Sequence, residues 1–381
     1  MRRNRIFIAI AIVALGALLA GCGVEFKAGP GGSITVGGAN SKSAEEERTL
    51  TEPHVTGSGL DVQTDLGSVE VTADKAINEV QVVATVKAFA ETEDEAREHL
   101  KEIKVKLERR DDKVLKITCE YPPSKPGVRG SCSFKVRVPE AQGAKIRSGN
   151  GSITLKSLAG VADVKTDIGA VTISDQDGKV IAHSGNGAIR LTKSAGDAEL
   201  KTDIGSVTGH EITGKVTARS GNGAIDIAAA GGDVEASTDI GSVTVKNAPA
   251  VTARSGNGAM TVVQAKGKVQ ARTAIGQVKL EQVSGPVEAE SGNGAVIYAP
   301  ASDSAVAFHL KTDIGAVTVH LPASAAGSIE ATTDVGAVTV NGSRKARSVT
   351  GERSLKKIVL SDKGPSSTIH TGNGSVTITL D

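Results

Sequence analysis

The sequence predicts an all-β protein, a β-solenoid of alternating 18-residue half-coils with a small α+β capping insertion near its N-terminal end. The first observation is a repeated phrase, Ser-Gly-Asn-Gly-(Ala/Ser)-(Ile/Val), whose copies begin at Ser148, Ser184, Ser220 and Ser291, with variants at Ser255 and Thr371. The second is Thr-Asp-Ile-Gly-(Ala/Ser)-Val, which lies midway between them and begins at Thr166, Thr202, Thr238 and Thr312, with degenerate copies at Thr273 and Thr333. A fixed period of this kind is the signature of a solenoid.

The first 21 residues predict a lipoprotein signal peptide. A basic start, Met1-Arg-Arg-Asn-Arg5, precedes an apolar run from Ile6 to Ala20, which is too short for an ordinary membrane span. The run ends in Leu19-Ala-Gly-Cys22, which resembles the lipobox of bacterial lipoproteins. That resemblance implies lipidation at Cys22, including palmitate, and a membrane anchor in the cell envelope. In a cell with two membranes the outer membrane is expected, because residue 23 is Gly rather than Asp. An ordinary secretory signal with a chance cysteine is the alternative.

Three segments follow. Residues 22–58 are rich in Gly, Ser and charge, and we expect a flexible tether. Residues 59–140 hold a first copy of the Asp-type motif and then a strand–helix–strand cap. The expected helix begins at Thr92, with Glu95 three residues on, which is a capping-box pattern. Such a cap would cover the open end of the first coil.

Residues 145–381 form the predicted solenoid domain. Its apolar residues recur at every second position, as in short strands with one face inward. A 36-residue coil would stack each Asn turn on another Asn turn, and like-on-like stacking favours that choice over an 18-residue coil. It predicts a rod roughly 30 Å long at about 4.8 Å per coil, where the 18-residue coil would give about 60 Å.

The last repeats fit the 36-residue coil only with an exception. Thr333-Asp-Val-Gly336 falls on the Asn face, so Val335 would replace one Asn of the stack. The final strand, 375–380, has no evident cap in the sequence.

The repeated asparagines are interpreted as a structural ladder that points inward, each amide bonding to the next. An outward row of ligand-binding amides is the alternative. The predicted ladder consists of Asn150, Asn186, Asn222, Asn257, Asn293 and Asn373.

The repeated aspartates are interpreted as residues that cap their own turns rather than as calcium ligands. The glycine-rich pattern of calcium-binding solenoids is missing, and Ala274 occupies the same position in one repeat. Basic side chains precede the turns on both faces and are expected to be solvated: Arg147, Lys165, Lys201, Arg219, Arg254, Arg272 and Lys311.

Cys119 and Cys132 predict a disulfide, because they form an even pair in an oxidising compartment and flank a Pro- and Gly-rich turn. The bridge would tie off a hairpin. A cysteine–metal site is less favoured, since neither another cysteine nor a His pair lies near in sequence.

Composition argues against several classes of function. The formal net charge is +1, and it falls to about −2 once the three arginines of the signal peptide are removed, which disfavours a nucleic-acid partner. Aromatic residues make up 2% and there is no Trp, so the usual platforms for bases and sugars are scarce. We find no Ser/His/Asp order, phosphate loop or metal-ligand spacing, and we expect no catalytic residues, cofactor or metal.

The two repeated phrases resemble a bacterial family of β-strand-repeat proteins of unknown function that are described as putative adhesins. The resemblance covers about 145–380 with an outlying copy at 64–71, and it implies the fold without supplying functional residues. The expected function is a non-enzymatic, lipid-anchored adhesion or scaffold module, with the membrane and an envelope glycan or protein as partners. A polysaccharide-active β-helix enzyme and a self-polymerising envelope scaffold are the alternatives.

Overall fold

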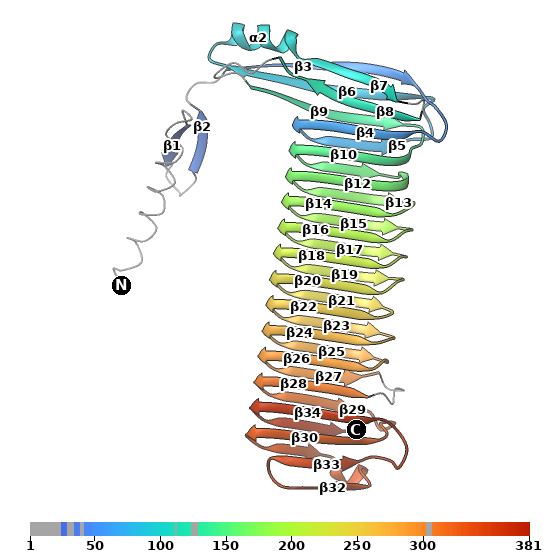
Figure 1. Cartoon of the computed structure of the whole chain (residues 1–381), viewed down its shortest axis with the longest axis vertical. Coiled ribbons are helices and arrows are strands. Elements are labelled where there is room, and N and C mark those ends of the chain that lie inside the picture. Colours follow the sequence, from blue (N-terminus) through green and yellow to red (C-terminus); the bar gives the residue numbers. More distant parts are fainter. Residues whose placement is uncertain (1–23, 29–33, 39–41, 111–112, 123–128, 302–306) are drawn as a thin grey trace.

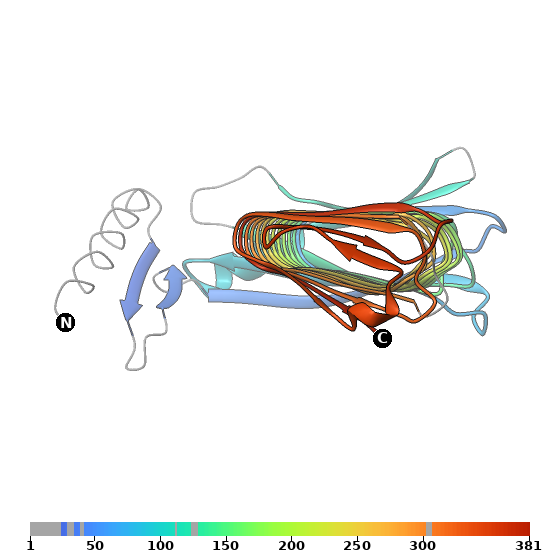
Figure 2. The ribbon, with the colours of Figure 1, turned by 90° about the horizontal axis from the view of Figure 1, so that it is seen from below.

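The computed structural model describes residues 24–28, 34–38, 42–110, 113–122, 129–301 and 307–381. Its main body is a β-solenoid in which two long sheets face each other across a thin interior (Figures 1 and 2). The predicted all-β solenoid is therefore confirmed. The predicted signal peptide and Cys22 lie outside the described residues.

Each coil contributes one strand to each sheet, and the strands within a sheet are parallel to their neighbours along the coils. Sheet 1 contains, in spatial order, β4 (Gly59–Leu66), β10 (Gln142–Asn150), β12 (Ala159–Ile168), β14 (Val180–Asn186), β16 (Ala198–Ile204), β18 (Val216–Asn222), β20 (Val234–Ile240), β22 (Val251–Asn257), β24 (Val269–Ile275), β26 (Val287–Asn293), β28 (Phe308–Ile314), β34 (Ser366–Asn373) and β30 (Ser328–Val335). Sheet 2 contains β5 (Val69–Ala73), β11 (Ile153–Lys156), β13 (Val171–Gln176), β15 (Ile189–Ser194), β17 (Val207–Ile212), β19 (Ile225–Ala230), β21 (Val243–Ala248), β23 (Met260–Ala265), β25 (Val278–Val283), β27 (Val296–Pro300), β29 (Val317–Leu321), β35 (Val376–Leu380) and β31 (Val338–Asn341).

The strand register shows that one coil is 18 residues long. Ser220 of β18 lies opposite Thr238 of β20, and Asn222 lies opposite Ile240. The 36-residue coil was wrong, because each 18-residue unit is a whole coil rather than half of one. Asn turns and Ile turns therefore alternate along the same edge of the solenoid.

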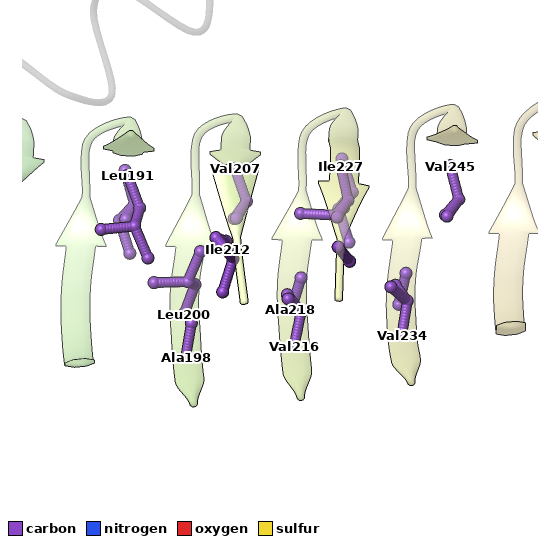
Figure 3. Packing of buried hydrophobic residues seen from close by; sticks show 14 of the residues in the cluster. Leu191, Ala198, Leu200, Val207, Ile212, Val216, Ala218, Ile227, Val234 and Val245 are labelled. Atoms are coloured by element: carbon purple, nitrogen blue, oxygen red, sulfur yellow. The ribbon is translucent and has the colours of Figure 1, made fainter. Parts of the chain in front are cut away.

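The interior is filled by small and medium aliphatic side chains from both sheets. Alternation places Val216 and Ala218 of β18 inward, where they face Ile225 and Ile227 of β19, and all four are fully buried. Figure 3 shows the same packing in neighbouring coils, from Leu191 to Val245. Because most inward positions carry Val, Ala, Ile or Leu, the two sheets lie close together and the coil is flat.

The N-terminal end is closed by the predicted cap. Its elements are β3 (Lys42–Pro53), β6 (Glu79–Ala90), α2 (Glu93–Glu102), β7 (Lys104–Arg110), β8 (Val114–Glu120) and β9 (Arg129–Val138). Strands β9 and β6 extend sheet 2 beyond β5, and β8 and β7 extend sheet 1 beyond β4 (Figure 1). Helix α2 begins with the expected capping box, in which the Glu95 N–H donates to Thr92 Oγ1 at 3.2 Å.

The tether prediction for 22–58 was wrong for residues 42–53. These residues form β3, which pairs along its whole length with β6, so they belong to the cap. Further upstream, β1 (Val24–Ala28) and β2 (Ile34–Gly38) pair with each other in antiparallel fashion.

The C-terminal end has an order that differs from the sequence. Strands β34 and β35 come last in the chain, but they lie between the β28–β29 coil and the β30–β31 coil. Asn373 thus lies between Ile314 and Val335, so the alternation of turns is kept and Val335 replaces no Asn. The final strand, for which the sequence shows no evident cap, is covered on both sides, because β35 lies between β29 and β31. In sheet 1, β33 (Leu355–Val359) covers β30 and is followed by β32 (Ser348–Thr350); the short helix η1 spans Ser343–Lys345.

Candidate interaction surface

A buried row of Ser and Thr hydroxyls stabilises the turn at one edge of the coils from β10 to β30. In each case the hydroxyl donates to the carbonyl of the glycine that ends the neighbouring turn, for example Thr238 Oγ1 to Gly223 O and Ser220 Oγ to Gly205 O, both at 2.9 Å. Thr238 is 2% exposed and Ser220 is 6% exposed. This hydroxyl ladder consists of Ser148, Thr166, Ser184, Thr202, Ser220, Thr238, Ser255, Thr273, Ser291, Thr312, Thr371 and Thr333.

The repeated asparagines lie outside the solenoid, so the inward Asn ladder was wrong. All six are exposed: Asn150, Asn186, Asn222, Asn257, Asn293 and Asn373. The alternation of inward and outward side chains ends with the hydroxyl residue, since Ser220 is buried, Gly221 is half-buried and Asn222, the last residue of β18, is exposed. The side chain that points inward and forms the ladder is the Ser or Thr two residues before each asparagine.

The exposed asparagines alternate with exposed aliphatic residues in a single row. The aliphatic members are more than half exposed: Ile168 (54%), Ile204 (53%), Ile240 (53%), Ile275 (51%), Ile314 (53%) and Val335 (64%). We call this edge, with the six asparagines, the Asn/Ile row. In the described part of the chain the other large exposed hydrophobic residues are Val55 and Val161. Most of the large exposed hydrophobic side chains of the described residues therefore lie along this one edge.

Close backbone contact explains why the two turns alternate. A Cβ added at Gly221 would lie 2.6 Å from the carbonyl oxygen of Asp203 in the preceding coil. The same contact recurs at Gly185, where the oxygen of Asp167 would be 2.5 Å away. A coil that follows an Asp-type turn must therefore carry glycine at this position. Because Asp-type and glycine-type turns alternate between 18-residue coils, the sequence repeats every 36 residues.

The outer face of sheet 1, next to the row, carries the predicted basic side chains. Arg147 pairs with Asp163 at 2.5 Å, and Lys311 pairs with Asp313 at 3.5 Å. Lys201, Arg219 and Arg254 are exposed and have no ion-pair partner among the described residues.

These cations influence the acidic group between them. The pKa of Glu235 lies below the ordinary value, first because Lys215 Nζ donates a hydrogen bond to its carboxylate at 2.7 Å, and further because Arg219 and Arg254 are near. The central coils therefore combine exposed positive charge with the apolar row.

The repeated aspartates are exposed and lie near the ends of their strands, as Asp203 does in β16 and Asp239 in β20, and turn capping by their side chains stays a prediction. Among the described residues no group of three or more His, Cys, Asp or Glu side chains could hold a metal ion. Ala274 occupies the aspartate position between Asn257 and Asn293 without changing the strand register.

The opposite edge of the solenoid has a different corner, at which each coil from β11 to β25 has one non-glycine residue with a positive φ. Asn247, Gln264 and Gln282 occupy this position in successive coils, with φ between 53° and 60°. They line an open groove of about 600 Å³ together with small residues and Lys266. Among the described residues its lining includes no carboxylate, whereas glycoside hydrolysis needs a pair of them. A smaller hollow on the same edge carries Asp175, Asp177 and Glu211, all exposed.

Cys119 and Cys132 lie side by side but on different sheets, since β8 belongs to sheet 1 and β9 to sheet 2. Both are free thiols in the structure. A hydrogen bond from Cys132 lowers the pKa of the Cys119 thiol. The disulfide stays a prediction. If it forms, it would link the two sheets of the cap rather than the two strands of a hairpin.

None of the helices in the described ranges has the length and apolar character that a membrane crossing requires.

Comparisons with known proteins give structural neighbours. No protein-family model matches the chain, and no curated protein matches it. Among solved structures, it is similar to a putative cell adhesion protein from Clostridium sporogenes, with 14% identity over 89% of this chain and 100% of that chain and a TM-score of 0.16. It is also similar to putative adhesins from Bacteroides fragilis (10% identity, 88% and 97% covered, TM-score 0.20) and Parabacteroides distasonis (11% identity, 89% and 97% covered, TM-score 0.23).

These neighbours are bacterial proteins with the same description as the family that the repeats resemble. Because the identities and TM-scores are this low, the function is inferred from the surface of this chain.

Proposed function

We propose that the protein is a non-enzymatic adhesion module of the cell envelope. In this proposal a lipid on Cys22 anchors it in the membrane, and the Asn/Ile row binds an envelope glycan or protein. The rod then serves to hold a repeated contact surface away from the membrane.

The observation that carries the proposal is the Asn/Ile row. Exposing an aliphatic side chain to water is unfavourable, by roughly 25 cal/mol for each Å². Threonine or serine at a half-exposed strand position would expose less apolar surface to water than isoleucine does. Isoleucine nevertheless recurs in every second coil. Alternating amides supply hydrogen-bond donors and acceptors beside each apolar side chain. A partner with its own linear repeat would meet the same pair of groups at every second coil, which multiplies weak contacts along the rod.

A binding screen with the full chain tests the row. We would compare the wild type with a variant that carries Ile204→Thr, Ile240→Thr and Ile275→Thr, on a glycan array and on a panel of purified envelope proteins. The matched control replaces Thr208, Thr244 and Thr261 by Ala on the outer face of sheet 2. We expect the first variant to lose binding and the control to keep it, with both melting near the wild type. Equal binding by all three proteins would contradict the assignment of the row.

The anchor is tested separately in cells. We expect labelled palmitate on the wild-type protein and none on Cys22→Ser, which should be released from the membrane. Label that persists on the Cys22→Ser protein would refute the lipid anchor and leave the binding surface unaffected.

A further inference from the structure

Near the C-terminal end of the rod, one coil is formed by strands that come later in the sequence than the strands of the next coil. Strands β28 and β30 are consecutive in sheet 1 along the sequence, but β34 lies between them and pairs with both. In sheet 2, β35 lies between β29 and β31 in the same way. We call the place that β34 and β35 occupy the insertion gap.

Backbone contact prevents the gap from closing. A Cβ at Gly372 would lie 2.7 Å from the carbonyl oxygen of Asp313 in β28. Strand β30 carries Asp334 at the position that Gly372 holds in β34. If β30 were stacked directly on β28, the Asp334 side chain would meet this oxygen at the same short distance. The gap therefore requires a segment with glycine there, which is a segment of the Ser/Thr-Gly-Asn-Gly type.

The connection from β29 to β30 is long enough to skip one coil. Six residues, 322–327, separate these strands, whereas three residues, 213–215, separate β17 from β18. Three additional extended residues reach about 10 Å, which is close to two coil rises at about 4.8 Å each. The β28–β29 and β30–β31 coils can thus stand one coil apart before β34 and β35 lie between them.

The inserted segment is held on both sides by bonds that any equivalent segment would make. Thr371 Oγ1 donates to Gly315 O at 2.8 Å, and Thr333 Oγ1 donates to Gly374 O at 2.8 Å. The Gly315 N–H donates to Asn373 O at 3.0 Å. Ile369, Thr371, Val376 and Ile378 of the segment are at most 1% exposed.

We propose that the insertion gap is a strand-binding site that takes up residues 366–380 of a second copy of this chain as well as its own. The exchanged segment would make the same contacts as the chain's own segment, so the closed and exchanged forms differ little in free energy. The exposed residues 362–364, which precede β34, are the hinge. Because the gap lies near the end of the rod opposite the cap, with β30, β33 and β32 beyond it (Figure 1), exchange would join two molecules through these ends. The inference does not depend on the Asn/Ile row or on the lipid.

Disulfide trapping between two full-length variants tests the exchange. His309 of β28 and Thr368 of β34 are paired neighbours on the outer face, and His309 Nδ1 lies 2.8 Å from Thr368 Oγ1. One copy carries His309→Cys and the other carries Thr368→Cys, so within the gap they meet only after exchange. We expect a covalent heterodimer when the two copies are mixed, incubated and oxidised.

Three controls make the result decisive. The first control mixes a Glu288→Cys copy with a His309→Cys copy. These positions are paired neighbours in β26 and β28, two strands that do not exchange, so the mixture should give only the heterodimer background that the native cysteines produce. A single chain with both His309→Cys and Thr368→Cys should form its internal bridge, which shows that the geometry permits the bond. Adding Gly372→Asp to the Thr368→Cys copy should reduce the heterodimer to background, because the Asp side chain cannot lie against Asp313. An internal bridge without any heterodimer would overturn the proposal, and so would a heterodimer that Gly372→Asp leaves unchanged.

Discussion

The hydroxyl ladder makes a sharp prediction about stability in the middle of the rod. Thr238→Val keeps the size and branching of the side chain but removes the hydroxyl that donates to Gly223 O. The site is 2% exposed, so water cannot replace the lost donor without opening the turn. Removing one partner of a buried hydrogen bond costs about 1–3 kcal/mol, and we expect the free energy of unfolding to fall by that amount.

Two comparison variants separate the ladder from the exposed row. Thr238→Ser keeps the donor, as Ser220 does in the adjacent coil, and loses a methyl group worth about 0.8 kcal/mol. Asn222→Ala changes an exposed amide that makes no hydrogen bond to another described residue, and should stay within about 0.5 kcal/mol of the wild type. Urea unfolding followed by circular dichroism gives the three values, provided that the m-values agree. A larger loss for Asn222→Ala than for Thr238→Val would refute the hydroxyl ladder and restore the inward Asn.

Further predictions concern the coil, the turns and the cap. Sheet 1, with β7 and β8 at one end and β33 and β32 at the other, has 17 strands and predicts a rod of about 80 Å at about 4.8 Å per strand, which small-angle scattering would measure; a value near half of this would contradict the 18-residue coil. Gly221→Ala should destabilise the protein by more than about 2 kcal/mol, because its Cβ would meet Asp203 O at 2.6 Å, while Asp239→Ala should melt near the wild type; similar melting of both would refute the close-contact explanation. Oxidative folding should join Cys119 to Cys132, and mass spectrometry of a proteolytic digest that finds both as free thiols would show that no bridge forms.

The period, the all-β class and the N-terminal cap could be predicted from sequence because each rests on local chemistry. Strands were visible in the period-2 pattern around Val216, and the capping box at Thr92 gives the start of α2. The coil length could not be found from the pattern alone, since a 36-residue sequence period is also what alternating turns on an 18-residue coil produce. The glycine–carbonyl contact at Gly221 decides between them, and it exists only between coils.

The candidate surface was missed for a related reason. Counting inward positions from Val216 through Ser220 predicts that Asn222 also points inward, but the alternation stops at the end of β18 and Asn222 is exposed. The strict recurrence of Ser or Thr before each turn was the signal that could have revealed the hydroxyl ladder. The insertion of β34 between β28 and β30 had one trace in the sequence, namely that Thr333 begins an Asp-type turn out of order.

The most direct test of the account is a disulfide scan along the Asn/Ile row. Asn222 and Ile240 are paired neighbours in adjacent coils, about 4.8 Å apart along the axis, which suits a disulfide. Asn222 and Asn257 are two coils apart, about 9.6 Å, which is too far. We predict that oxidation joins the Asn222→Cys, Ile240→Cys pair and leaves the Asn222→Cys, Asn257→Cys pair open. Closure of the second pair without the first would contradict the 18-residue coil, and with it the alternating surface on which the proposed function rests.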